Sequence, residues 1–205
     1  MTWNMWLAFL AASVVISVTP GPGAVLSIAT GMRHGYSNAL RAISGLQTAL
    51  LIHLSIVALG LGAVLAASDM AFLALKIAGA LYLVWLGIQK WRAPVEEIDE
   101  NALPSRKGRG FYLQGVLVNL TNPKGLVFIV AFVPQFVMPS QPQLPQFLII
   151  GLTMVGVDLI VMSGYALLAG RCSAWFHSPN MIGMQNRVFG GLFVSAGALL
   201  AASSR

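Results

Sequence analysis

Residues 19–23 read Thr-Pro-Gly-Pro-Gly, and residues 121–125 read Thr-Asn-Pro-Lys-Gly. Each motif interrupts an apolar segment that is long enough to cross a bilayer, and a proline inside a helix removes a backbone hydrogen bond. In hydrocarbon the freed carbonyl groups need new partners, so such breaks persist only inside protein or beside a wet cavity. Paired breaks at corresponding positions in two halves of a chain therefore indicate the binding site of a transporter.

The composition indicates an integral membrane protein. Of the 205 residues, 57% are hydrophobic and 9% are charged, whereas soluble domains carry about 25% charged residues. The net charge of +6 would suit nucleic-acid binding, but the basic residues stand at the ends of hydrophobic runs, as the positive-inside rule expects. We therefore expect the lipid bilayer, and no nucleic acid, as a partner of the chain.

Six apolar runs predict six membrane crossings, because about 20 apolar residues span the hydrocarbon core. The first run contains no Lys or Arg before Val18, so we expect a retained helix rather than a cleaved signal peptide. The predicted fold is an all-α membrane protein whose single transporter domain covers residues 1–205, with helices 1 and 4 broken at Pro20/Pro22 and at Pro123. The approximate limits of the runs are 3–32, 39–67, 71–91, 111–138, 144–170 and 185–203.

The two halves resemble each other, which predicts an internal repeat of residues 1–91 and 111–205, joined by a cytoplasmic linker at 92–110. Each half has three spans, an odd number, so the second copy is inserted upside down, as in transporters with alternating access. The alignment pairs residues 17–22 with 120–124, residues 45–47 with 151–153, and residues 76–82 with 187–193.

The distribution of basic residues predicts the orientation of the chain. Nine of the twelve Lys and Arg residues lie in the loops at 33–41, 90–110 and 171–187. By the positive-inside rule these loops are cytoplasmic, so both termini are expected on the periplasmic side.

Three ionisable residues, His53, Lys124 and Asp158, lie within predicted spans, where an uncompensated charge is costly and usually functional. Asp158 is a candidate proton carrier, and the alternative is a structural ion pair with Lys124. Lys124 is a counter-charge for a substrate carboxylate or for Asp158, or else it snorkels to the headgroups. His53 either relays protons or is a hydrogen-bonded packing residue.

Neutral polar residues near the breaks, such as Gln47 and Asn119, either bind substrate or cap freed backbone, and capping is favoured for Asn122 beside Pro123. The predicted site contains no metal and no cofactor. The predicted substrate and proton pathway comprises Thr19, Pro20, Gly21, Pro22, Gln47, His53, Asn119, Asn122, Pro123, Lys124 and Asp158.

These motifs resemble the lysine-exporter (LysE) superfamily of amino-acid efflux proteins, and specifically its RhtB-type branch. The family's N-terminal proline signature is present at 17–24, and its Asn-Pro-Lys signature is present at 119–124, followed by Phe-Val-Pro-Gln-Phe at 132–136. Residues 77–87 are likewise typical of the family, and the resemblance runs nearly end to end.

The resemblance implies a bacterial inner-membrane exporter that uses the proton gradient to expel small neutral amino acids, such as homoserine or threonine; it also allows a homo-oligomer. Residues 45–48, His53 and residues 138–144 are most similar to exporters of homoserine and its lactone. A lactone has no free carboxylate, so the handle shared by both substrates is the amino group. Lys124 is then better placed as a partner of Asp158 or of the broken backbone.

Other functional classes find less support. A primary pump would need a nucleotide site, and the chain has no Gly-x-x-x-x-Gly-Lys-Ser/Thr motif. An intramembrane hydrolase would use Ser163 or Ser55 with His53, but Val161-Met162-Ser163-Gly164 lacks the first glycine of a nucleophile turn. An exporter of divalent metals would need clustered ligands, and the spans offer one His and one Asp. We therefore expect a transporter and not an enzyme.

Overall fold

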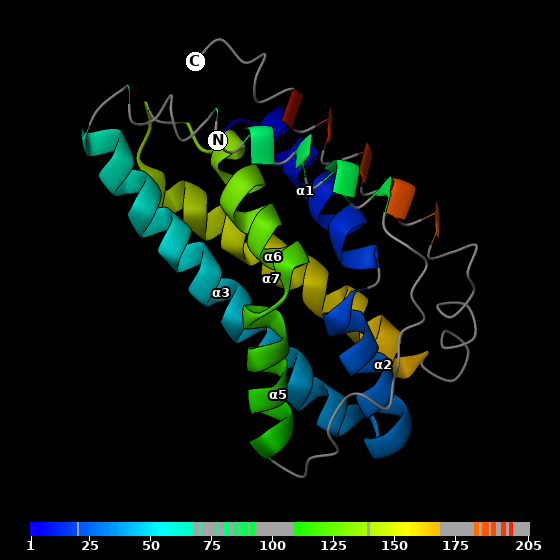
Figure 1. Ribbon diagram of the computed structural model, residues 1–205. Helices are drawn as coiled ribbons and strands as arrows, with labels where there is room; N and C mark the ends of the chain where they lie inside the picture. Colours follow the sequence, from blue (N-terminus) through cyan, green and yellow to red (C-terminus); the bar gives the residue numbers. More distant parts are fainter. Residues whose placement is uncertain are drawn as a thin grey trace.

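The computed structural model describes residues 1–19, 21–67, 109–138 and 140–168, with scattered residues between 70 and 92 and between 183 and 198. Within these residues all regular structure is helical (Figure 1). Pro20, most of the predicted linker at 92–110 and most of the predicted loop at 171–187 lie outside the described residues.

Two helices are long and apolar enough to cross a membrane unaided. Helix α3 (Tyr36–Ala67) contains the apolar stretch Tyr36–Gly60, with a mean hydropathy of 1.8. Helix α7 (Gln143–Leu167) has a mean hydropathy of 2.1. Both match predicted runs, and both expose many large apolar side chains, as a lipid-facing surface requires.

Two further helix pairs are bent at the predicted positions, and each pair is long and apolar enough to form one broken span. Helix α1 (Trp3–Val18) and helix α2 (Pro22–His34) meet at an angle of 55°. Helix α5 (Arg109–Leu120) and the segment after it meet at 60°. Pro22 and Pro123 each begin the second half-helix, where a missing N–H costs no hydrogen bond. The segment after the second break comprises helix α6 (Pro123–Val127), the π-helical turn η2 (Phe128–Phe132) and the 3₁₀ turn η3 (Val133–Phe136).

The two broken spans run in opposite directions (Figure 1). Helix α2 contacts α5, and α1 contacts η3, so the start of each span lies beside the end of the other. The two broken spans also make corresponding contacts with the unbroken helices. The first half-helix of one span, α1, packs on α7, and the first half-helix of the other, α5, packs on α3. An inverted repeat predicts these matching contacts; the count of six spans stays a prediction.

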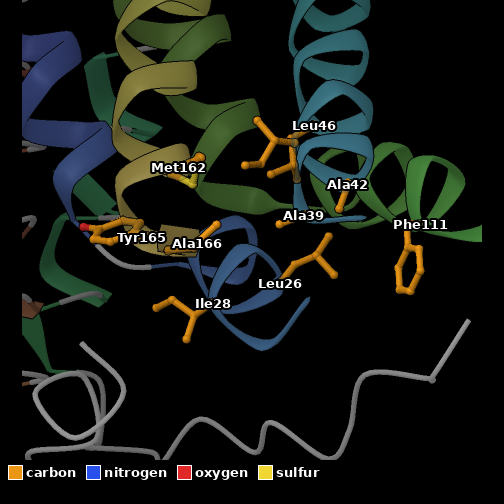
Figure 2. Packing of buried hydrophobic residues seen from close by; sticks show 11 residues of the cluster. Leu26, Ile28, Ala39, Ala42, Leu46, Phe111, Met162, Tyr165 and Ala166 are labelled. Atoms are coloured by element: carbon orange, nitrogen blue, oxygen red, sulfur yellow. The ribbon is translucent and has the colours of Figure 1, made fainter. Parts of the chain in front are cut away.

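The helices pack through two apolar clusters, one on each side of the breaks. The first joins α2, α3, α5 and α7 around residues such as Leu26, Leu46 and Met162 (Figure 2). The second joins α1, α3, α7 and the turns after the second break, around Phe9 and Ile150. The level of the breaks lies between the clusters, and the cavity described below opens there.

Glycines bring three pairs of segments into backbone contact. A Cβ atom added to Gly45 on α3 would lie 2.0 Å from the Tyr112 carbonyl oxygen on α5, and one added to Gly115 would lie 2.0 Å from the Ala42 carbonyl oxygen. A Cβ on Gly31 of α2 would lie 2.5 Å from the Ala166 carbonyl oxygen on α7. Gly87 and Gly190, on the segments assigned to the third and sixth spans, make a similar contact. Such close approach is typical of helices that associate in lipid.

Basic residues gather at one end of the bundle. Arg33 lies in the last turn of α2, Arg41 lies in the first turns of α3, and Arg109 begins α5. These three ends lie together at the bottom of Figure 1, and the rings of His34 and Phe111 are 5.0 Å apart there. The opposite end holds the starts of α1 and α7, and neither 1–19 nor 137–153 contains Lys or Arg. The cytoplasmic position of the basic end stays a prediction of the positive-inside rule.

Candidate functional site

A cavity of about 70 Å³ lies between the two helix breaks. A site for one water needs about 10–15 Å³ of this kind of volume, so the cavity has room for several water-sized groups, the scale of a small amino acid. Its wall mixes apolar side chains from both clusters with polar groups from α1, α3, α7 and the breaks. The lining residues are Ser13, Ile16, Ser17, Gly21, Gly23, Ala24, Leu46, Leu50, His53, Asn119, Asn122, Lys124, Gly125, Phe128, Ile129, Met154, Asp158 and Met162.

Asp158 of α7 is the acidic group of this cavity. The Gln47 side-chain amide of α3 donates a hydrogen bond to Asp158 Oδ2 over 2.6 Å, and the Ser17 side chain of α1 also bonds to this carboxyl group. The positive charge of Lys124 acts on the same carboxylate. Groups from three helices and from the second break therefore surround the Asp158 carboxylate. A charged group within a membrane span requires such polar partners.

Lys124 joins the two breaks directly. Its Nζ atom donates a hydrogen bond of 2.5 Å to the backbone carbonyl oxygen of Thr19, at the end of α1. Its side chain also lies against Gly21, where an added Cβ would be 3.3 Å from Lys124 Cδ. The first break leaves the Thr19 carbonyl group without a helical partner, and Lys124, which follows the second break, supplies the hydrogen bond that it needs.

The two asparagines of the second break hold backbone groups. Asn119 donates a hydrogen bond of 2.8 Å to the Leu46 carbonyl oxygen, which ties α5 to α3. The Asn122 side-chain oxygen accepts a hydrogen bond of 3.1 Å from the Lys124 backbone N–H and caps α6. Both residues line the cavity. The bond of Asn122 corresponds to the capping alternative, whereas Asn119 bonds to the backbone of the unbroken helix α3.

His53 of α3 lines the cavity at a different level from Asp158. Its imidazole is hydrogen-bonded to the Leu120 backbone, while Nδ1 is buried and has no partner among the described residues. Ser13 of α1 also lines the cavity, and its hydroxyl group likewise has no partner among them.

The structure brings most of the predicted site residues to one place. Gly21, His53, Asn119, Asn122, Lys124 and Asp158 line the cavity, and Thr19 is linked to it through its hydrogen bond with Lys124. Pro22 and Pro123 begin the adjoining half-helices, and Pro20 lies outside the described residues. Gln47 reaches the site through Asp158. Within the described part of the chain, no three His, Cys, Asp or Glu side chains form a group that could hold a metal.

Sequence reasoning missed three polar residues at the site. Ser13 and Ser17 lie one helical turn apart on α1, and this spacing is the signal that places both on one face. The third is Tyr165 of α7, whose hydroxyl group donates a hydrogen bond to the Val18 carbonyl oxygen beside the first break. No sequence pattern indicates that contact.

We expect Tyr165→Phe to destabilise the first break, because the Val18 carbonyl group loses its donor at a partly buried position. The loss should be about 1–3 kcal/mol in the free energy of unfolding, measured by thermal denaturation of the purified protein in detergent. Tyr112→Phe is the matched control, since that hydroxyl group bonds to Thr48 at an exposed site. Equal destabilisation by both substitutions would contradict a special role for Tyr165.

Known proteins are similar to this chain along nearly its whole length. The family model of the LysE type translocators matches residues 14–204. A homoserine/homoserine lactone efflux protein of Salmonella typhimurium (strain LT2) is 48% identical over 99% of this chain and 98% of that protein. An uncharacterised membrane protein of Vibrio cholerae is 44% identical over 98% of both chains. A leucine efflux protein of Enterobacter sp. (strain 638) is 25% identical over 97% of this chain and 95% of its own length.

No solved structure matches the chain at a significant level. The family match covers both helix breaks, Asp158 and Lys124, and the predicted membership of the lysine-exporter family is confirmed. The chain therefore belongs to the LysE type translocator family, and it is a membrane transporter rather than an enzyme.

Proposed function

We propose that this protein exports small neutral amino acids, above all homoserine and its lactone, across the bacterial inner membrane in exchange for protons. The observation that carries the proposal is the cavity between the two breaks, with Asp158 and Lys124 in its wall. The efflux protein of Salmonella typhimurium, which is 48% identical, supports the direction and the substrate class.

The amino group is the part of the substrate that Asp158 would bind. Homoserine and its lactone share an ammonium group, and only homoserine has a free carboxylate. Asp158 offers a carboxylate in the cavity wall, whereas the Lys124 ammonium group donates to the Thr19 carbonyl group. A charge-assisted hydrogen bond from the substrate ammonium group to Asp158 therefore suits both substrates.

Proton exchange would follow from competition for the same carboxylate. Substrate enters from the cytoplasmic side and its ammonium group pairs with Asp158. After the cavity opens outward, a proton takes the place of the departing ammonium group, and the neutral carboxyl group returns to face the cytoplasm. Each elementary charge that crosses the full membrane potential contributes about 2.3 kcal/mol per 100 mV, which supports more than about tenfold accumulation.

The test is uptake of labelled homoserine into inverted membrane vesicles from cells that express the protein. Respiration acidifies the lumen of these vesicles, so export appears as accumulation. We expect accumulation that is abolished by an uncoupler and absent from vesicles without the protein. Accumulation that resists the uncoupler would contradict proton antiport, and no homoserine transport under any gradient would contradict the substrate class.

The same assay distinguishes amino-acid export from the remaining alternative, which is export of divalent metals. Metal export would give uptake of a divalent cation that homoserine does not inhibit, and no observation in the described part of the chain favours it.

A further inference from the structure

Two sets of polar side chains on α1, α3 and α7 lie at different levels of the cavity. Ser17 of α1, Gln47 of α3 and Asp158 of α7 are joined by hydrogen bonds and define the first level. Ser13 precedes Ser17 by one helical turn, and His53 follows Gln47 by six residues. At a rise of about 1.5 Å per residue, these steps correspond to about 6 and 9 Å along the helix axes.

Ser13 and His53 are both displaced from the first level toward the same end of the bundle. Helix α1 runs parallel to α7, because Trp6 bonds to Thr153 near one end and Tyr165 bonds to Val18 near the other. Helix α3 runs antiparallel to α7, because Gln47 bonds to Asp158 whereas the later Leu54 packs on the earlier Gly151. Ser13 and His53 are therefore both displaced toward the start of α7, at the end without Lys or Arg.

The second level has unused hydrogen-bonding capacity. Ser13 is 2% exposed and His53 is 7% exposed, and neither Ser13 Oγ nor His53 Nδ1 has a partner among the described residues. His53 is hydrogen-bonded to the Leu120 backbone and Nδ1 has no partner within the described part of the chain, which assigns the proton to the other ring nitrogen; in this neutral tautomer Nδ1 is an acceptor. A hydroxyl group can both donate to such an acceptor and accept from the serine O–H, so it suits this pair of groups.

We propose that Ser13 and His53 form the subsite for the side-chain hydroxyl group of homoserine. This inference rests on the proposed function, in which the substrate ammonium group pairs with Asp158. In an extended four-carbon amino acid the amino nitrogen and the terminal oxygen are about 5 Å apart. With a hydrogen bond of about 2.8 Å at each end, the molecule can bridge the two levels. Apolar groups between the levels, such as Leu50 and Met154, face the carbon chain. The protein therefore selects amino acids with a terminal oxygen over aliphatic ones of the same length.

The subsite is tested by competition in inverted vesicles that take up labelled homoserine. The competitors are unlabelled homoserine and 2-aminobutyrate, which has the same carbon chain without the hydroxyl group. Ser13→Ala removes one partner of that hydroxyl group. His53→Gln removes the other, because glutamine keeps an N–H donor for Leu120 but has no acceptor at the position of Nδ1. The matched control is Ser55→Ala, two residues from His53, where the hydroxyl group bonds to its own helix at Leu51.

In the wild type we expect homoserine to compete more strongly than 2-aminobutyrate. Each of the two subsite variants should raise the half-inhibitory concentration of homoserine about fivefold to tenfold, the effect of one lost hydrogen bond. The value for 2-aminobutyrate should stay within about twofold, and Ser55→Ala should change neither. An unchanged preference in both variants, or a wild type without preference, would overturn the subsite alone. A wild type that takes up no homoserine would instead overturn the proposed function.

Discussion

Asp158→Asn should reduce gradient-driven export of homoserine to the background of vesicles without the protein, a loss of more than about tenfold. Asparagine has nearly the same shape and can still accept the hydrogen bond from Gln47, so the packing around the site is preserved. It carries no charge for the substrate ammonium group and takes up no proton. Both steps that the exchange needs are therefore removed by one substitution that leaves the fold intact.

The control for this substitution lies on the same helix. Ser163 belongs to α7 but does not line the cavity, so Ser163→Ala should keep export within about twofold of the wild type. The amount of each variant in the membrane is measured on immunoblots, which separates lost transport from lost protein. Normal accumulation by Asp158→Asn, with sensitivity to an uncoupler retained, would exclude Asp158 from proton coupling.

Among the glycine-to-alanine substitutions on α3, Gly45→Ala should cause the largest loss of stability. The new Cβ atom would lie 2.0 Å from the Tyr112 carbonyl oxygen and 2.9 Å from the Val116 backbone nitrogen, so α5 has to move away from α3. Overpacking of this kind costs about 1–3 kcal/mol. Because α3 and α5 also carry Gln47 and Asn119, the shift should lower transport as well. The measurements are the midpoint of thermal denaturation in detergent and homoserine uptake.

Gly60→Ala provides the matched control on the same helix. An added Cβ at Gly60 meets no atom within 4 Å, and alanine is favoured over glycine inside a helix by about 0.5–1 kcal/mol. We therefore expect Gly60→Ala to leave the stability unchanged or to raise it slightly. If both substitutions had the same effect on the denaturation midpoint, the close contact between α3 and α5 would not stabilise the protein.

The sequence indicates the parts of this site that look unusual in a membrane span. Prolines and charged residues stand out in apolar runs, so the breaks at Pro22 and Pro123 and the candidates Lys124 and Asp158 could be predicted. Serine is common in membrane helices, and whether one faces a cavity depends on how its helix is rotated against its neighbours. Ser13 and Ser17 were therefore missed, although their spacing places them on one face.

The partners of the predicted residues could not be read from the sequence, because they depend on where the two broken spans cross. Gln47 and Asn119 were given the same two alternatives. In the structure Gln47 bonds to the Asp158 carboxylate, whereas Asn119 bonds to the Leu46 backbone. The bond from Lys124 to Thr19 joins residues that are 105 positions apart in the chain, and only the folded arrangement brings them together.

The glycine contacts join four helices of the bundle into two tightly packed pairs. Gly45 and Gly115 hold α3 and α5 backbone to backbone, and Gly31 does the same for α2 and α7, which leaves no room for sliding within either pair. Between the pairs the glycines meet side chains instead, as Gly23 meets Leu46 and Gly151 meets Leu54. Side chains can change rotamer at little cost. Opening of the central cavity to either side of the membrane would thus be a tilt of α2 with α7 against α3 with α5.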